Sequence, residues 1–234
     1  NRYKISPKNI ISFHEHSGRA KVEYICQKLI EGKNIALVSE SGTPIIQDPG
    51  YEVIIECIRR DIPLTIIPGP NAAISALAIS GLPADSFLFV GFLPKSPSKR
   101  KNKLQELSSL PYTLIFYESP NRIEKFLAEI YETLGDRKAC LVRELTKIYE
   151  EATRGRVSEI LSGVKDKKIK IKGEIVLVVD GFRGELIRNF TEDDIKGEIL
   201  NLISQGISKK NALKVVSSKY DIDRQTLYNL STKI

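Results

Sequence analysis

Residues 34–60 read NIALVSESGTPIIQDPGYEVIIECIRR, and the order of elements in this stretch points to the fold class. The apolar run 34–38 indicates a short strand. The loop that follows, 39–50, contains two glycines and two prolines. Apolar residues then recur at helical spacing over 51–59. A strand that leads through a turn-rich loop into a helix is the repeating unit of α/β folds.

The same order of elements recurs along the chain. A strand over 64–67 is ended by Pro68-Gly69-Pro70, and an Ala-rich helix over 71–80 follows, with Asn71 as its N-cap. A helix over 19–31 ends at Gly32. The pattern predicts further strands at 87–92, 113–117, 138–143 and 174–179, and further helices at 104–110, 120–134 and 157–162. We therefore predict an α/β layered fold.

The segment PKSPSKRKNK, residues 94–103, is basic and interrupted by proline, which favours an exposed loop or linker. A boundary there divides the chain into an N-terminal α/β domain, 1–93, and a second α/β domain, 94–185. The tail, 191–234, differs from both. It opens with a capping box at 191–194 and predicts short helices over 193–205, 208–220 and 224–230. This extension resembles a helix-turn-helix bundle, so nucleic-acid binding and a packing appendage are both open.

The composition sets limits on the class of protein. Of 234 residues, 41% are apolar and 28% charged, which is typical of a globular protein without a membrane span. The net charge of +7 favours a polyanionic partner. Three widely spaced cysteines make a poor disulfide framework and favour the cytoplasm. The pair His14 and His16 lacks metal-ligand spacing, so we expect no metal.

Four turns that follow predicted strands could carry chemistry. The loop 39–50 and the turn 68–71 place glycines and a helix N-terminus where α/β proteins bind ligands. YESPNR, 117–122, and RELTK, 143–147, end two further strands in clustered Glu and Arg. An ordinary crossover loop and solvated surface charges are the alternatives. No dinucleotide or P-loop glycine pattern is present.

At these turns the sequence resembles the tetrapyrrole methylase superfamily, and within it the enzymes that methylate a ribose 2′-hydroxyl of a cytidine in small-subunit ribosomal RNA. The segments that carry the resemblance are SFHEHS (12–17), VSESGTPIIQDPGYEV (38–53), PGPNAAISALAISGLPADSFLFVGFLP (68–94), TLIFYESPNRI (113–123), RELTKIYEE (143–151) and GEIVLVV (173–179). The helical tail also fits that group.

The resemblance implies two α/β domains with a cofactor cleft between them, a homodimer, and S-adenosyl-L-methionine held largely by backbone atoms. The implied cofactor-binding residues are Ser39, Gly42, Thr43, Pro44, Asn71, Ala72, Tyr117 and Leu145. Three departures from the family pattern stand out. Glu40-Ser41 replace Asp-Ala, Asn71 replaces Ser or Cys, and the family's first strand and Gly-rich loop would precede Asn1. We therefore expect the N-terminal domain to lack those two elements.

Methyl transfer to a hydroxyl needs in-line positioning and benefits from a base. The expected catalytic residues are Glu118, Arg122, Glu144 and Lys147, with Lys147 as a base only if its pKa is depressed. The expected RNA contacts are Arg143, Lys99, Arg100 and Lys101. The expected partner is ribosomal RNA or the small ribosomal subunit. A methylase of a tetrapyrrole or another small molecule, and an inactive RNA-binding relative, are the rival interpretations.

Overall fold

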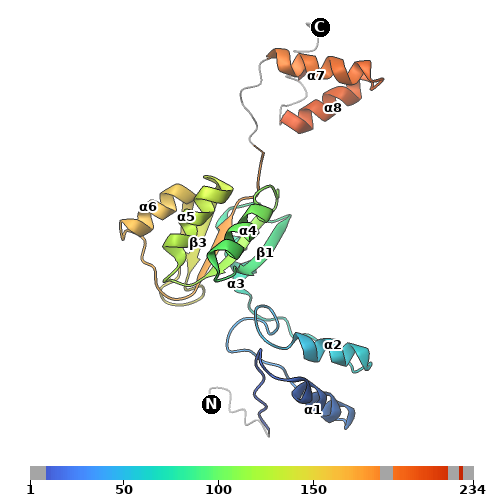
Figure 1. Cartoon of the computed structure of the whole chain (residues 1–234), viewed down its shortest axis with the longest axis vertical. Coiled ribbons are helices and arrows are strands. Elements are labelled where there is room, and N and C mark those ends of the chain that lie inside the picture. The colour runs from blue at the N-terminus through green and yellow to red at the C-terminus, as the bar shows by residue number, and fades with distance from the viewer. Residues whose placement is uncertain (1–8, 185–191, 221–226, 229–234) are drawn as a thin grey trace. The chain divides into compact units, whose positions relative to one another are not determined.

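A computed structural model describes residues 9–184, 192–220 and 227–228 (Figure 1). The chain forms two compact units: one contains residues 1–108 and 112–181, and the other contains 109–111 and 182–234. Within the described ranges, no helix has the length and apolar character needed to cross a membrane. The division into two α/β domains at 94 remains a prediction.

The larger unit is built on one five-stranded sheet in the order β1-β2-β5-β3-β4. β1 and β2 are parallel, whereas the pairs β2–β5, β5–β3 and β3–β4 are antiparallel. The strands are β1 (Phe87–Phe92), β2 (Thr113–Glu118), β3 (Lys138–Arg143), β4 (Glu151–Arg156) and β5 (Ile175–Val179). The sheet is therefore mixed, and the predicted α/β fold is confirmed.

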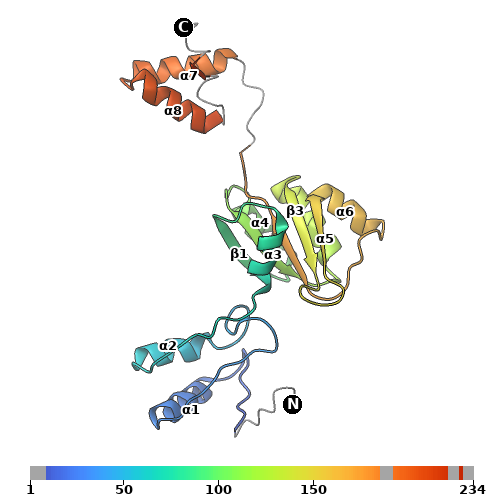
Figure 2. The same ribbon diagram turned by 180° about the vertical axis from the view of Figure 1, so that it is seen from behind.

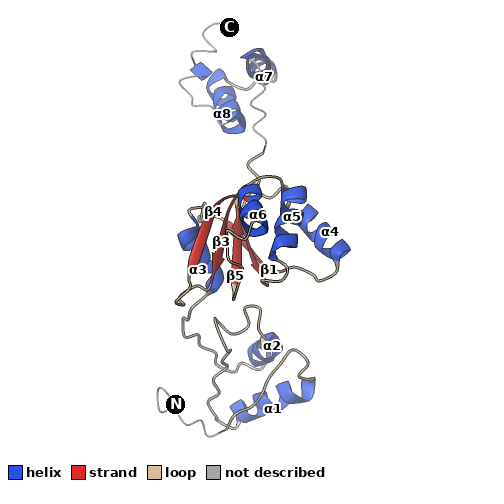
Figure 3. Cartoon of the chain, turned by 90° about the vertical axis from the view of Figure 1, so that its left-hand side faces the viewer, coloured by secondary structure: helices blue, strands red, loops and turns tan. Residues whose placement is uncertain are grey.

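Helices cover both faces of this sheet (Figures 2 and 3). Helix α3 (Ala72–Ser80) lies on one face; α4 (Pro97–Leu107), α5 (Ile123–Leu134) and α6 (Val157–Lys165) lie on the other. Because both faces are covered, the central strands are apolar runs without alternation. All five residues of β5 are buried, as are Leu114, Ile115 and Phe116 of β2. These runs made the central strands predictable.

Strand β4 was not predicted. Its sequence, EATRGR, is polar and contains a glycine, so it has neither an apolar run nor strong strand propensity. It lies at the edge of the sheet and pairs only with β3, where charged side chains can reach solvent. Its place in the sheet comes from that pairing and not from its composition.

The predicted strands at 34–38 and 64–67 are wrong. Neither segment is paired as a strand in the described structure, although the helices around them, α1 (Arg19–Ile30) and α2 (Tyr51–Arg59), form as predicted. Val38 is 79% exposed and Ile67 is 81% exposed. A strand needs a hydrogen-bonded neighbour, and apolar propensity by itself does not provide one.

The predicted loop at 94–103 is also wrong, because α4 begins at Pro97. Proline is well tolerated at the first position of a helix, where its missing N–H has no intrahelical partner. Leu104 and Leu107 of this helix are buried. The expected helix over 104–110 overlaps only the last turn of α4, which ends at Leu107.

The second unit contains α7 (Glu192–Ser204) and α8 (Lys209–Tyr220), which confirm two predicted helices. They share a cluster of buried apolar residues: Ile195, Ile199, Leu213, Val216 and Leu227. Thr191 of the capping box, and 224–226 and 229–230 of the third predicted helix, lie outside the described residues.

Candidate functional site

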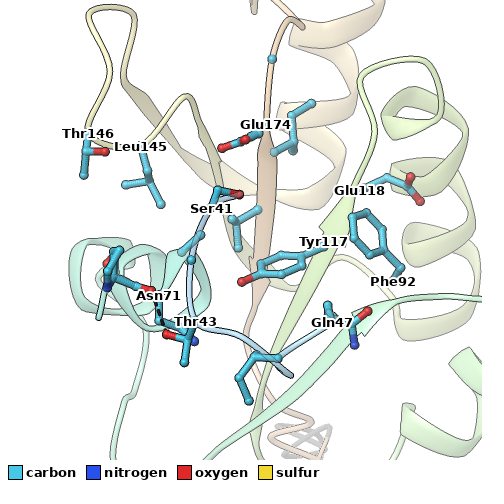
Figure 4. Close-up of a pocket in the computed structure, with 18 of the residues that line it drawn as sticks. Ser41, Thr43, Gln47, Asn71, Phe92, Tyr117, Glu118, Leu145, Thr146 and Glu174 are labelled. Atoms are coloured by element: carbon cyan, nitrogen blue, oxygen red, sulfur yellow. Dashed lines mark hydrogen bonds between the residues drawn. The ribbon is translucent and has the colours of Figure 1, made fainter. Parts of the chain in front are cut away.

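A pocket of about 600 Å³ lies within the larger unit (Figure 4). All four turns that the sequence singled out contribute to its wall. The expected site residues that line it are Gly42, Thr43, Asn71, Ala72, Tyr117, Glu118, Leu145 and Lys147. Ser39, Pro44, Arg122, Arg143 and Glu144 do not line it. The fold therefore brings together residues as distant in the sequence as Gly42 and Lys147.

The loop 39–50 folds back on itself to reach this pocket. Left-handed backbone angles occur at Gly42, Ile45, Gln47 and Gly50, with φ of 73°, 76°, 65° and 133°. The Thr43 hydroxyl donates a 3.0 Å hydrogen bond to the Pro70 carbonyl. The loop is thereby tied to the turn before α3. Strained backbone of this kind is typical of functional loops.

Asn71 begins α3 as predicted. Its Oδ1 accepts a 3.1 Å hydrogen bond from the Ile74 N–H, so the side-chain oxygen satisfies one of the free donors at the helix N-terminus. Its side-chain NH₂ group keeps its capacity to donate toward a ligand in the pocket.

Tyr117 lies at the centre of the pocket. Its hydroxyl oxygen accepts a 3.2 Å hydrogen bond from the Ala73 N–H. Burial raises the pKa of this hydroxyl above its usual value, so Tyr117 is protonated at neutral pH and retains one O–H to donate. Figure 4 shows Asn71 and Thr43 on one side of the Tyr117 ring, and Phe92 and Glu118 on the other.

Glu118 is a buried carboxylate whose two oxygens differ. Oε1 accepts from the Ser119 N–H at 2.6 Å and from the Arg122 Nε–H at 2.8 Å, and Arg122 also forms an ion pair with it at 2.7 Å. All the hydrogen bonds of Glu118 in the described structure end on Oε1. Oε2 accepts none of these bonds, and the whole Glu118 side chain is only 3% exposed.

The loop between β3 and β4 is held by a second ionic cluster. Lys147 lies 3.0 Å from Glu144 and 3.3 Å from Glu174, while Glu144 Oε1 also accepts from the Glu174 N–H at 3.0 Å. Glu144 and Thr146 have φ of 50° and 63°. A Cβ at Gly173 would lie 2.0 Å from Glu144 Oε1, so this packing requires a glycine.

These contacts decide which groups can act as a base. The hydrogen bond from the Glu174 backbone, and then Lys147, lower the pKa of Glu144, which makes it a weaker base. The hydrogen bond to Glu144 raises the pKa of Lys147. The depressed pKa that a basic Lys147 would need is therefore absent, and that expectation is corrected.

The expected RNA contacts lie in different environments. Lys99 and Lys101 are exposed on α4. Arg100 is 7% exposed: its guanidinium lies 2.5 Å from Glu129 and donates to the carbonyls of Pro94 and Lys95. Because this side chain points into the protein and is fully engaged, Arg100 is corrected from an RNA contact to a structural residue.

Arg143 also has an internal partner. It is paired with Glu151 of the neighbouring strand, with an Nε–O distance of 2.9 Å. No group of three or more His, Cys, Asp or Glu side chains that could hold a metal ion occurs among the described residues.

Several pocket residues escaped the sequence interpretation, among them Gln47, Phe92, Ser119 and Glu174. Each lies within or beside a quoted motif. Nothing in the residue pattern, however, distinguishes a side chain that faces the pocket from one that faces solvent.

A pocket at strand ends with a helix N-terminus in its wall is typical of α/β proteins that bind a small ligand. The sequence profile of the Tetrapyrrole (Corrin/Porphyrin) Methylases matches residues 4–161. The chain therefore belongs to the tetrapyrrole methylase family.

Similar proteins support this assignment. Ribosomal RNA small subunit methyltransferase I of Halalkalibacterium halodurans is 38% identical over 98% of this chain and 80% of its own length. The protein of that name from Vibrio cholerae is 36% identical over 97% of this chain and 78% of its own length. The crystal structure of the methyltransferase CobJ has the same fold, with a TM-score of 0.51 and 17% identity over 76% of this chain and 79% of that one.

Proposed function

We propose that this protein transfers a methyl group from S-adenosyl-L-methionine to the ribose 2′-hydroxyl of a cytidine in small-subunit ribosomal RNA. Family membership supports the methyl transfer, and the relatives named ribosomal RNA small subunit methyltransferase I support the substrate. The buried Glu118 lines the pocket, and its Oε2 accepts no hydrogen bond from the described residues; this is the observation that carries the chemistry.

The pocket fits the cofactor in size and in chemistry. Its volume of about 600 Å³ lies within the range of small-molecule sites. Leu145, Val176 and Ala72 offer an apolar wall for a nucleobase, while the backbone at Gly42 and Thr43 and the Asn71 amide offer polar contacts. When bound, the cofactor supplies a methyl group activated by its sulfonium.

The protein's own groups then position the acceptor and take its proton. Glu118 Oε2 accepts the hydroxyl proton, and Arg122 holds the carboxylate in place through Oε1. Arg122 is thus a positioning residue. Glu144 and Lys147 stabilise the loop that presents Leu145, and their shifted pKa values favour the charged forms of both.

RNA affinity comes from exposed basic residues outside the pocket. Lys99 and Lys101 project from α4, and the lysines of α8 extend the positive charge of the second unit. Contacts of this kind act on phosphates and weaken as the salt concentration rises. With RNA as its substrate, the protein acts in the cytoplasm.

A homodimer is part of the proposal. Large apolar side chains are exposed in the described N-terminal part, including Val38, Ile66, Ile67 and Tyr51, and exposed apolar surface commonly marks a protein interface. Light scattering of the purified chain tests this, and a monomeric mass at micromolar concentration would contradict it.

The test of function measures methyl incorporation into small ribosomal subunits, with a porphyrin precursor as the competing acceptor. We expect transfer to the subunit alone, and Glu118→Gln should lower turnover at least about a hundredfold, the scale of a lost general base. Binding of S-adenosyl-L-methionine, followed by calorimetry, should be nearly unchanged. Transfer to the porphyrin, or no heat with the cofactor, would refute the proposal. Equal losses of turnover and cofactor affinity in Glu118→Gln would refute the role of Glu118.

A further inference from the structure

The end of β1 contains an irregularity that turns an aromatic ring into the pocket. β1 pairs with β2 in a register that shifts between Phe89 and Gly91. In a regular strand, residues three positions apart point to opposite faces of the sheet. Here both Phe89 and Phe92 contact the Tyr117 ring edge-on, with centroids 5.1 and 5.5 Å away. Bulges that re-aim a side chain are over-represented beside active sites.

The Phe92 ring, which the bulge turns into the pocket, is not fully covered by protein. Phe92 lines the pocket and is 51% exposed, whereas Phe89 is half-buried and packs against the core beneath α3. A large aromatic side chain left uncovered inside a pocket contributes little to the core. It does offer a face on which a planar ligand can stack.

Gln47, in the loop 39–50, lies against the same bulge at Gly91. A Cβ at Gly91 would lie 2.4 Å from the Gln47 Nε2, and Gly91 itself has a φ of 70°. The absence of a side chain at 91 therefore makes room for the amide. Gln47 lines the pocket, and within the described part of the chain its amide has no hydrogen-bond partner, so the protein leaves its donors and its acceptor unused. Figure 4 shows Gln47 below Phe92, away from Asn71.

An aromatic face beside a free amide is how proteins hold an unstacked RNA base, which stacks on the ring and presents its edge to hydrogen-bonding groups. We propose that Phe92 and Gln47 hold the base of the nucleotide that is methylated. The proposal rests on the RNA methyltransferase function above. Phe92 stacks on the base, and Gln47 reads the cytosine edge, which carries an amino donor next to a ring-nitrogen acceptor.

The experiment compares methyl transfer to small ribosomal subunits that carry cytidine or, after mutation of the RNA gene, uridine at the methylated position. Phe92→Leu keeps an apolar side chain but removes the ring, so kcat/KM should fall about tenfold or more with either base, the scale of a lost base–aromatic stack. Phe92→Tyr should restore most of it. Gln47→Ala should instead lower the ratio of kcat/KM for the cytidine-containing subunit to kcat/KM for the uridine-containing subunit.

Phe87→Leu is the matched control, because Phe87 lies on the same strand, is 41% exposed and does not line the pocket. Titration with S-adenosylhomocysteine should show unchanged cofactor affinity in every variant. If Phe92→Leu behaves like Phe87→Leu, or if Gln47→Ala keeps the full cytidine preference, the inference is wrong. If the unsubstituted protein methylates neither subunit, the proposed function itself fails and the inference falls with it.

Discussion

Arg122→Gln offers a quantitative test of the Glu118–Arg122 pair. The Glu118 side chain is 3% exposed, and Arg122, at 35%, supplies both an Nε–H donor and an ion pair to Oε1. Removing one partner of a fully buried ion pair costs about 3–5 kcal/mol. Solvent at Arg122 and the surviving 2.6 Å bond from Ser119 reduce that cost. We expect a loss of about 2 kcal/mol in the free energy of unfolding.

The assay is urea unfolding followed by circular dichroism, with Glu118→Gln and the double variant completing a cycle. The coupling between the two positions should be about 1–2 kcal/mol. Lys28→Gln is the matched control: it breaks a 2.7 Å ion pair with Glu31 in which both side chains are more than a third exposed, and should cost less than about 0.5 kcal/mol. A loss for Arg122→Gln no larger than that of Lys28→Gln would refute the buried-pair reasoning.

Three further outcomes are expected. Asn71→Ala removes the bond to the Ile74 N–H and should cost about 1 kcal/mol of stability and weaken cofactor binding in calorimetry; unchanged values for both would contradict the cap. Arg59 and Arg60 hold the pKa of Glu56 at about 2, so its stabilisation is present above the unfolded value of about 4.3 and is lost as the pH falls toward 2; Glu56→Gln should flatten the acid limb of the stability–pH curve, and an unchanged limb would argue against this. Deleting 191–234 should weaken binding to the small subunit but spare S-adenosyl-L-methionine binding, whereas unchanged subunit affinity would remove the tail from RNA recognition.

The central strands were predictable because their sequences are continuous apolar runs, as in β2 and β5. A strand that is buried on both faces needs apolar residues at nearly every position, so its sequence is a continuous apolar run. The edge strand β4 was not predictable, because edge pairing leaves no distinctive pattern. The helix at Pro97 was missed because its first residues are basic and polar and resemble a loop, although proline is common at a helix start. The same limit explains the error at 34–38, where propensity indicated a strand but no partner pairs with it in the described structure.

The candidate site, like the fold, was predictable from the sequence only in part. Motifs that follow predicted strands identified the Gly42–Thr43 turn, Asn71, Tyr117 and Leu145, all of which line the pocket, although the strands predicted before the first two do not form in the described structure. Motifs could not show that Arg100 is buried against Glu129 or that the pKa of Lys147 is raised. The burial of Arg100 depends on a partner that is distant in the sequence. The raised pKa of Lys147 depends on the conformation of its loop.

By itself, then, the sequence determined the α/β class, the family and the turns that line the pocket, since these depend on local composition and on the order of motifs. Only the tertiary structure decided which oxygen of Glu118 is bound by Arg122 and that a bulge at Gly91 sets Phe92 and Gln47 in the pocket. The physical reason is that a side chain's direction, exposure and charge depend on its neighbours in space, and these come from segments that only the fold brings together.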